Sequence, residues 1–234
     1  MNAVGEDAAR EDPQVTPAME DYLRAAYRLR DEDGPITTQR LAEALGVSSP
    51  SVTNMVKRLH ELGLVRHERY RGVELTETGE QIALEVVRHH RLLELYLVQA
   101  LGYAWDEAHA EADRLEHHIS EEMEARIDVV LGHPMRDPHG DPIPSRDGTV
   151  AELGDSRLLD LEPGEGGVIA RVSDRDSEQL RYLGGLGLYP GVAVVVLDKL
   201  PFEGPLRIGV GEAEHLISPP LAAAVRVTGQ ASAA

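Results

Sequence analysis

The sequence predicts a protein that is mainly α-helical, with a smaller β-rich part near its C-terminal end. Apolar residues follow helical spacing over several capped segments between residues 16 and 131, with one short hairpin pattern among them. Proline and glycine then dominate residues 133–147, and short strand-like segments follow. We therefore expect five parts: a disordered leader at 1–15, domains at 16–77, 78–147 and 164–229, and a linker at 148–163.

The composition is that of a globular protein without cysteine: of 234 residues, 42% are apolar and none is Cys. The lack of cysteine excludes disulfides, iron–sulfur clusters, thiolate zinc sites and cysteine nucleophiles, so any metal ion must be bound by carboxylates and imidazoles. No apolar run reaches the roughly 18 residues of a membrane-spanning helix, and the acidic N-terminus lacks a hydrophobic signal region. We expect a cytoplasmic protein with no membrane partner.

The net charge of −18 argues against a protein that coats nucleic acid nonspecifically. The charge is uneven, however. Residues 34–73 contain six arginines and lysines against three glutamates, so this segment is locally basic. A local DNA-binding surface is therefore compatible with the acidic whole.

The first domain shows the pattern of a helix-turn-helix. Thr16-Pro17 gives a cap and first-turn signal for a helix over about residues 17–31. The two threonines at 37–38 can cap a second helix, which Gly46 ends, and the two serines at 48–49 can cap a third. Two short capped helices joined by a glycine-containing turn predict this motif.

A strand-like hairpin follows the third helix. Residues 64–69 and 72–76 alternate around Tyr70-Arg71, which predicts a wing and hence a winged helix-turn-helix domain. The exposed polar side of the third helix would reach base edges or phosphates, and wing arginines would contact phosphates. A winged helix used for protein contact is the alternative. The predicted DNA-binding residues are Thr38, Ser48, Ser49, Pro50, Ser51, Thr53, Asn54, Lys57, Arg58, Arg69 and Arg71.

Two long helices are predicted next, from residue 78 to 101 and from 109 to about 131. Long helices after a DNA-binding domain usually supply a dimer interface, because a palindromic double-stranded operator needs a two-fold symmetric reader. We expect a homodimer. Further along, five short strands and one short helix over residues 164–229 suit an SH3-like barrel.

The second of these helices carries a candidate metal site. His109, Asp113, Glu116 and His117 have the spacing i, i+4, i+7 and i+8, which places them on one helix face. Leu115, Ile119 and Met123 form an apolar stripe beside it. From this stretch alone, a solvated acidic face with a few histidines is the favoured interpretation.

Four stretches of the chain resemble the diphtheria toxin repressor family, which comprises metal-dependent bacterial transcriptional regulators. They are residues 19–23, 51–56, 70–76 and 115–118, and the connector from Pro138 to Pro144 fits the same family. The likeness covers about residues 16 to 227 and is strongest to the manganese transport regulator branch. It implies a repressor of metal homeostasis genes that a metal ion activates for operator binding.

The resemblance also implies two metal sites. The main site consists of Asp21, Asp113, Glu116 and His117. The ancillary site consists of His90, Glu94 and His109, with Asp176 and Gln179 from the barrel and Glu178 as the fallback ligand. His118 is expected to support the main site or to pack. Because Asp21 belongs to a different domain from the other main-site residues, the resemblance implies that one ion clamps two domains and fixes the spacing of the recognition helices.

Two departures from the family pattern affect the choice of metal. Iron-responsive members have methionine and cysteine where this chain has Asp21 and Asp113, and a set of oxygen and imidazole ligands favours Mn(II) while leaving Fe(II) open. Arg24 stands where the manganese branch has a glutamate, which favours the ancillary site over a paired-metal site. Since histidine ligands must be deprotonated, we expect weaker metal binding at low pH.

The sequence leaves three alternatives: an Fe(II)-responsive repressor, a metal-independent winged-helix regulator and a metalloenzyme. Di-iron enzymes need Glu-x-x-His motifs on two helices. Here Glu116 and His117 are adjacent, and the Glu-x-x-His motif from Glu212 to His215 lies in the barrel. We therefore expect neither enzymatic activity nor a small-molecule substrate.

Overall fold

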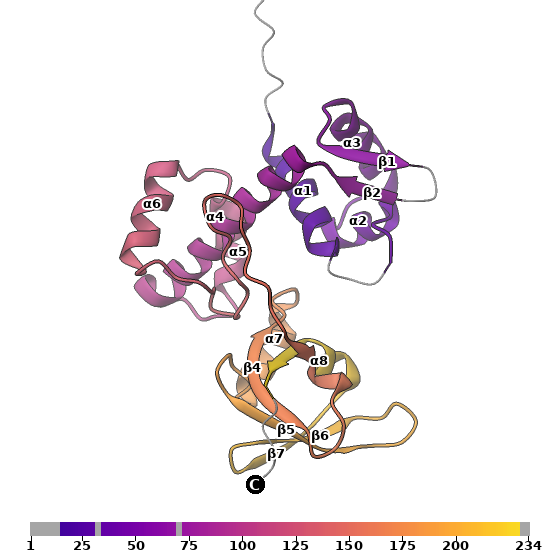
Figure 1. The fold of residues 1–234 in the computed structure, drawn as a ribbon, viewed down its shortest axis with the longest axis vertical. Coiled ribbons are helices and arrows are strands. Elements are labelled where there is room, and N and C mark those ends of the chain that lie inside the picture. The colour runs from indigo at the N-terminus through magenta and orange to yellow at the C-terminus, as the bar shows by residue number, and fades with distance from the viewer. Residues whose placement is uncertain (1–14, 31–33, 69–71, 230–234) are drawn as a thin grey trace, which may run out of the picture. The chain divides into compact units, whose positions relative to one another are not determined.

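The computed structural model describes residues 15–30, 34–68 and 72–229, and the chain divides into two compact units, residues 1–86 and 87–234 (Figure 1). The predicted leader, up to residue 14, and the predicted DNA contacts Arg69 and Arg71 lie outside the described residues. Within the described ranges, no helix combines the length and apolar character needed to cross a membrane.

The first unit confirms the winged helix-turn-helix prediction. Its elements are α1 (Pro17–Arg30), α2 (Thr38–Leu45), α3 (Ser49–Glu61), the antiparallel hairpin of β1 (Val65–Glu68) and β2 (Gly72–Leu75), and the start of α4 (Glu77–Leu101). Of the possible capping residues, Thr37 caps α2 and Ser48 caps α3, each accepting a hydrogen bond from a backbone N–H of the first turn. Gly46 ends α2 in the left-handed conformation, with φ of 64°.

The core of this unit consists of the apolar faces of its three helices. Met19, Leu23, Leu41 and Val52 are each at most 1% exposed. The wing is attached to α4 by a close backbone approach, because a Cβ on Gly79 would lie 1.9 Å from the Leu64 carbonyl oxygen. The opposite, buried side of α3 packs in this core, which fixes the position of its exposed side.

The second unit begins with the rest of α4 and continues with α5 (Ala108–Leu115) and α6 (Glu121–Val130). The prediction of one continuous helix from residue 109 to 131 is wrong. Ser120 starts a new helix, since its side chain accepts a hydrogen bond from the Met123 N–H at 3.2 Å. Met123 is 46% exposed and does not extend the apolar stripe of Leu115 and Ile119, which pack against the helical core.

The C-terminal part is a six-stranded antiparallel sheet of the SH3-like kind, in the order β3-β8-β4-β5-β6-β7. Its strands are β3 (Ser156–Arg157), β4 (Gly166–Val172), β5 (Ala193–Lys199), β6 (Leu206–Val210), β7 (Ala213–Ile217) and β8 (Val225–Thr228), with the helices η1 (Leu158–Asp160), α7 (Ser177–Gly185) and α8 (Pro219–Ala223). The predicted linker at 148–163 therefore ends too late, because β3 pairs with β8 and Leu158 is fully buried in the barrel core.

The proline- and glycine-rich connector at 133–147 is folded against the barrel. The Val172 N–H donates a hydrogen bond to the His139 carbonyl oxygen at 2.9 Å. Gly140 has φ of 92°, and a Cβ there would lie 2.0 Å from the Ala170 carbonyl oxygen, so a larger residue does not fit. This close approach brings connector side chains next to the helices that carry the predicted ligands.

Candidate metal centre

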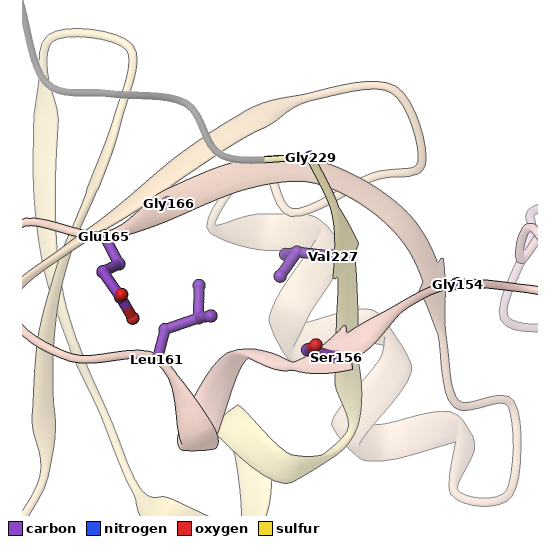
Figure 2. A pocket seen from close by; sticks show the side chains of 7 residues that line it. All are labelled: Gly154, Ser156, Leu161, Glu165, Gly166, Val227 and Gly229. Carbon is purple, nitrogen blue, oxygen red and sulfur yellow. The ribbon is translucent and has the colours of Figure 1, made fainter.

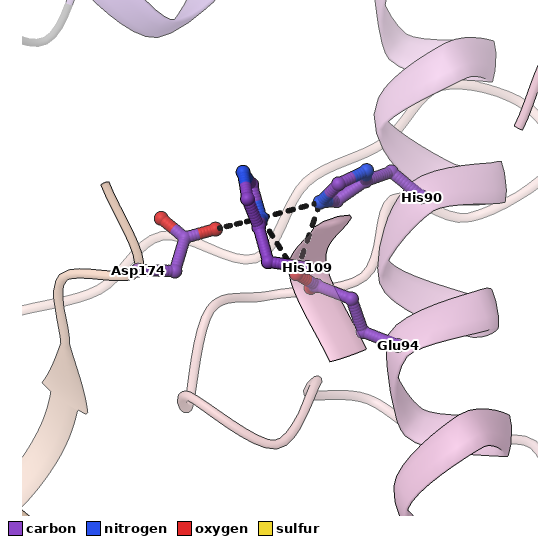
Figure 3. A group of neighbouring side chains, drawn as sticks. All are labelled: His90, Glu94, His109 and Asp174. Atoms are coloured by element: carbon purple, nitrogen blue, oxygen red, sulfur yellow. Dashed lines mark hydrogen bonds and ion pairs between the residues drawn. The ribbon is translucent and has the colours of Figure 1, made fainter. Parts of the chain in front are cut away.

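Four side chains meet between α4, α5 and the end of β4, and we call them the outer cluster: His90, Glu94, His109 and Asp174 (Figure 3). His90 and Glu94 lie four residues apart on α4, so both face the same side of the helix, and both are fully buried. His109 lies in the first turn of α5, and Asp174 follows β4. The structure thus brings together the three helical residues predicted for the ancillary site.

The spacing of the outer cluster fits a single cation. His90 Nε2 lies 3.0 Å from Glu94 Oε1 and 3.0 Å from His109 Nδ1, and His109 Nδ1 lies 2.9 Å from Glu94 Oε1. Asp174 Oδ2 lies 3.3 Å from His109 Nδ1. Neighbouring ligands of an octahedral ion with bonds of about 2.1 Å are separated by about 3 Å. Two imidazole and two carboxylate groups at this spacing suit a divalent metal of the manganese or iron type.

Opposite charges dominate the electrostatics of the outer cluster. Burial raises the pKa of Glu94, but the charge of His90, a hydrogen bond from His109 and the nearby His139 outweigh it and hold the pKa well below its ordinary value. Burial lowers the pKa of His109, whereas hydrogen bonds to Asp174 and Glu94 raise it to about 10. The carboxylates therefore hold a positive charge here, either a proton or a metal ion.

The barrel residue in this cluster differs from the predicted pair. Asp176 and Gln179 are exposed, and Asp176 is the N-cap residue of α7. The Asp176 carboxylate accepts hydrogen bonds from the backbone N–H groups of Glu178 and Gln179 and from the Gln179 side chain at 3.0 Å. The sequence signal for this was present, because Asp-x-x-Gln before a helix is a capping pattern. Asp174, two residues earlier and 8% exposed, lies in the cluster instead.

His90 of α4 and two residues at the end of α5 form a second group, the turn cluster of His90, Asp113 and Glu116, with His117 beside it. His90 Nδ1 lies 2.6 Å from Glu116 Oε2 and 3.4 Å from Asp113 Oδ1, and His117 Nε2 lies 3.2 Å from Glu116 Oε1. Glu116 keeps helical backbone angles although α5 ends at Leu115, which preserves the predicted common face. His90 contacts the outer and the turn clusters with its two ring nitrogens, a role that the sequence did not indicate.

Asp21, the predicted main-site ligand from the first unit, lies on α1. Its carboxylate is 4.0 Å from the guanidinium of Arg24, and its side chain is 40% exposed. The guanidinium partly balances the negative charge of this carboxylate. The participation of Asp21 in the main site stays a prediction.

A third group lies behind Glu94 and we call it the inner cluster: Glu94, Asp137 and His139. Burial raises the pKa of Asp137, and the charges of Asp141 and Glu94 raise it further, to about 8. Burial lowers the pKa of His139, but the nearby Glu94 raises it to about 9. Sequence reasoning missed both connector residues, because a segment rich in proline and glycine resembles a linker.

The predicted DNA-binding face of α3 is polar and exposed. Val52, Val56 and Leu59 are buried toward the core, and the intervening positions face solvent. These exposed residues are Ser48, Ser49, Pro50, Ser51, Thr53, Asn54, Lys57 and Arg58. Thr38, in the first turn of α2, is half-buried. The polar side chains of α3 therefore lie on the side opposite its buried residues, as a recognition helix needs.

A hollow of about 270 Å³ lies at the edge of the barrel sheet (Figure 2). It is lined by Gly154, Ser156, Leu161, Glu165, Gly166, Val227 and Gly229. The carboxylate of Glu165 accepts a hydrogen bond from the Glu162 N–H at 2.8 Å, and the described residues add no second charged side chain to the lining. It therefore lacks the donor set of the metal clusters.

Three family models match the chain in sequence order. One described as the N-terminal DNA binding domain of iron dependent repressors matches residues 14–73. One described as the iron dependent repressor metal binding and dimerisation domain matches residues 76–145. A FeoA domain model matches residues 156–229, and its start coincides with β3.

Individual proteins agree with these models. The iron-dependent repressor IdeR of Mycobacterium leprae is 34% identical over 218 residues, covering 88% of this chain and 94% of that protein. IdeR of Mycobacterium tuberculosis is 42% identical over 141 residues, which span 60% of this chain and 60% of that protein's length. A solved manganese-dependent transcriptional repressor in complex with manganese has a TM-score of 0.85 and 39% identity, covering 89% of this chain and 98% of that one. The manganese regulator SloR has a TM-score of 0.78 and 31% identity, with 92% and 99% covered.

Proposed function

The chain belongs to the iron-dependent repressor family, also known as the diphtheria toxin repressor family, and from this premise we propose that it is a DNA-binding transcriptional repressor activated by Mn(II). The family resemblance drawn from the sequence is thereby confirmed. The proposed partner is double-stranded operator DNA with palindromic half-sites, which places the protein in the cytoplasm.

The observation that carries the proposal is the donor set of the outer cluster. Two imidazoles and two carboxylates lie within 4.8 Å of one another, and the chain has no cysteine to offer a thiolate. Mn²⁺ prefers oxygen and imidazole ligands to ligand sets that include sulfur. A bound ion would supply a double positive charge to carboxylates that come from α4 and from the barrel, and so would hold these elements together.

The main site would connect the two units through their own side chains. We propose that Asp21 shares an ion with Asp113, Glu116 and His117, as the family resemblance implies. Asp21 would then be held in one position relative to the dimer helices, and the recognition helices would take the spacing of half-sites about one helical turn apart. Binding of metal and of operator would strengthen each other by the same factor.

Support for a homodimer comes from apolar side chains left exposed on the helical part of the second unit. Val129 and Val130, at the end of α6, are 64% and 68% exposed, and Leu101, at the end of α4, is 56% exposed. Contiguous exposed apolar patches commonly mark an interface, and Val129 and Val130 are adjacent in the chain. We propose that a second copy of the chain covers them and places two α3 helices on one operator.

The test is operator binding as a function of metal. Duplexes selected from a random pool by the Mn²⁺-loaded protein are titrated in the presence of Mn²⁺, anaerobic Fe²⁺, Zn²⁺ or a chelator. We expect Mn²⁺ to give the tightest binding at a given free concentration and the chelator to abolish specific binding. Specific binding that persists in chelator would establish a metal-independent winged-helix regulator instead.

An Fe(II)-responsive repressor is the second candidate. It is favoured by the curated relatives, which carry the name iron-dependent repressor. Tighter operator binding with saturating Fe²⁺ than with saturating Mn²⁺ would select it, because half-saturation concentrations alone follow the general order of affinities, in which Fe²⁺ exceeds Mn²⁺.

A further inference from the structure

The two oxygens of Glu94 face different groups of side chains. Oε1 lies 3.0 Å from His90 Nε2 and 2.9 Å from His109 Nδ1, in the outer cluster. Oε2 lies 3.7 Å from His139 Nδ1, on the side of the connector. Asp137 completes the inner cluster, in which one ligand atom of each residue lies within 4.8 Å of the others. Glu94 is thus shared by two donor groups.

The inner cluster contains polar atoms that the protein leaves unsatisfied. Glu94 and His139 are both fully buried, and neither Glu94 Oε2 nor His139 Nδ1 has a hydrogen-bond partner among the described residues. Buried polar atoms are nearly always paired, so two facing ones without a partner indicate a bound ion or water.

The ring of His139 is already oriented as a ligand. Its Nε2 lies 2.8 Å from the carbonyl oxygen of Trp105, an acceptor that requires Nε2 to carry the proton. An ion that displaces the proton from Nδ1 would then find the Nδ1 lone pair facing Glu94, 3.7 Å away. Metal-bound histidines typically donate their other ring N–H in this way, which fixes the ring.

Hydrogen bonds also fix the position of the Asp137 carboxylate. Its Oδ1 accepts hydrogen bonds from the backbone N–H groups of His139 at 2.8 Å and Asp141 at 2.9 Å. Its Oδ2 remains, with the Arg91 Nε 3.7 Å away, beyond hydrogen-bond distance. The Asp137 side chain is 1% exposed, so bulk water does not solvate this oxygen. The connector therefore presents one carboxylate oxygen and one imidazole nitrogen in preset positions.

We propose that Glu94, Asp137 and His139 bind a further divalent cation, with the Glu94 carboxylate bridging it to the ion of the outer cluster. Two carboxylates and one imidazole are ligands that divalent cations of the manganese or iron type accept, and the two carboxylate charges offset the double positive charge of such an ion. The inference rests on the proposed function in one respect, because it takes the outer cluster as a metal site. His109, 23% exposed, is the most accessible side chain of the outer cluster, so ions would reach the inner cluster past it.

The first test counts ions in the full-length protein. Wild type and Asp137→Asn are dialysed to equilibrium against Mn²⁺, and manganese per subunit is measured by elemental analysis. Asn keeps the size of Asp137 and the acceptor for its two backbone N–H groups but loses the ligating charge. We expect Asp137→Asn to bind one ion fewer per subunit than wild type. Asp176→Asn is the matched control, because Asn caps a helix as well as Asp, and its ion count should equal that of wild type.

The second test detects the carboxylate bridge. Two Mn²⁺ ions joined by Glu94 are close enough for spin coupling, which broadens the electron paramagnetic resonance spectrum of wild type. Asp137→Asn should show sharper spectra of uncoupled ions. His139→Gln, which removes the other connector ligand, should lose the same single ion and the same coupling, provided circular dichroism shows both variants folded in chelator. If one of these two variants fails to fold, the ion count and the spectrum of the other variant test the inference.

Equal ion counts and equal spectra in wild type and both variants would overturn the inference and assign a water molecule to the inner cluster. This outcome is separate from a failure of the proposed function, which is judged by the metal dependence of operator binding in wild type. A protein that binds operator without metal could still lose one Mn²⁺ in Asp137→Asn.

Discussion

The recognition helix α3 and the middle of α4 carry polar and charged side chains in opposite surroundings. On α3 these side chains are exposed and have local partners: Lys57 lies 3.8 Å from Glu61, and the Thr53 hydroxyl donates to the Ser49 carbonyl oxygen at 3.0 Å. On α4, His90 and Glu94 are fully buried, and their partners outside the helix come from α5, the residue that follows it, and the connector. The effects of substituting charged residues on α3 should therefore add and should weaken with salt. The effects of substituting His90 and Glu94 on α4 should not add, because these residues share partners.

The largest expected effect comes from removing the shared carboxylate. Glu94→Gln keeps the size of the side chain but removes the negative charge that faces both the outer and the inner clusters. Loss of a supporting partner alone typically costs 10–100-fold in metal affinity, so we expect the loss of this ligand to weaken Mn²⁺ binding by at least about 100-fold. Isothermal titration calorimetry with Mn²⁺ measures it.

The control for this change is Glu178→Gln. Glu178 is exposed in the first turn of α7 and was the fallback ligand predicted from the sequence. Its replacement should leave Mn²⁺ affinity unchanged within twofold. Equal losses in the two variants would contradict the distinction between a buried coupled cluster and an exposed surface.

Asp21→Ala tests whether the buried network acts on the recognition helix. In wild type, a coupling free energy of about 1–3 kcal/mol between metal binding and operator binding would raise operator affinity about 5–150-fold when Mn²⁺ is added. We expect the variant to lose this increase. The dimer should persist, because Asp21 lies on α1 and the exposed apolar residues of α6 are untouched. A gel-shift titration with Mn²⁺ and analytical ultracentrifugation measure the two properties. Operator binding with the metal dependence of wild type would refute the proposed clamp.

The coupled network also predicts a steep pH dependence of metal binding. Hydrogen bonds to Asp174 and Glu94 raise the pKa of His109 to about 10, so at pH 6–8 His109 holds a proton that an ion must displace. Each displaced proton makes the apparent affinity rise about tenfold per pH unit until the pH reaches that pKa. Mn²⁺ affinity measured at pH 6, 7 and 8 should rise by at least this factor per unit. A flat profile would show that His109 is not a ligand or is neutral before the ion binds.

The sequence predicted the exposed region better than the buried one, for a physical reason. The elements around α3 depend on local signals, the caps Thr37 and Ser48 and the glycine Gly46, which are visible in a few consecutive residues. The helix break at Ser120 is equally local, but it was masked by the helical spacing of the candidate ligands around it.

The metal region depends on contacts between residues far apart in the chain. The family resemblance predicted His90, Glu94 and His109. It did not predict Asp174, because the contact between Asp174 and His109 depends on where the chain leaves β4, and no short sequence pattern encodes that position. His139 reaches Glu94 only because the connector folds back on β4. Pairings of this kind follow from tertiary packing, so sequence spacing could not predict them.

The smallest expected effect comes from a single charge on the exposed helix. Lys57 is exposed and on the predicted DNA-binding side of α3, so Lys57→Ala should weaken binding by a similar, modest factor for every DNA sequence. Fluorescence anisotropy at several salt concentrations should show the slope of log affinity against log salt reduced by about 1, the value for one lost phosphate contact. Lys57→Arg keeps the charge and should keep the slope. An unchanged slope in Lys57→Ala would remove Lys57 from the phosphate contacts, and a loss confined to some sequences would assign it to base recognition.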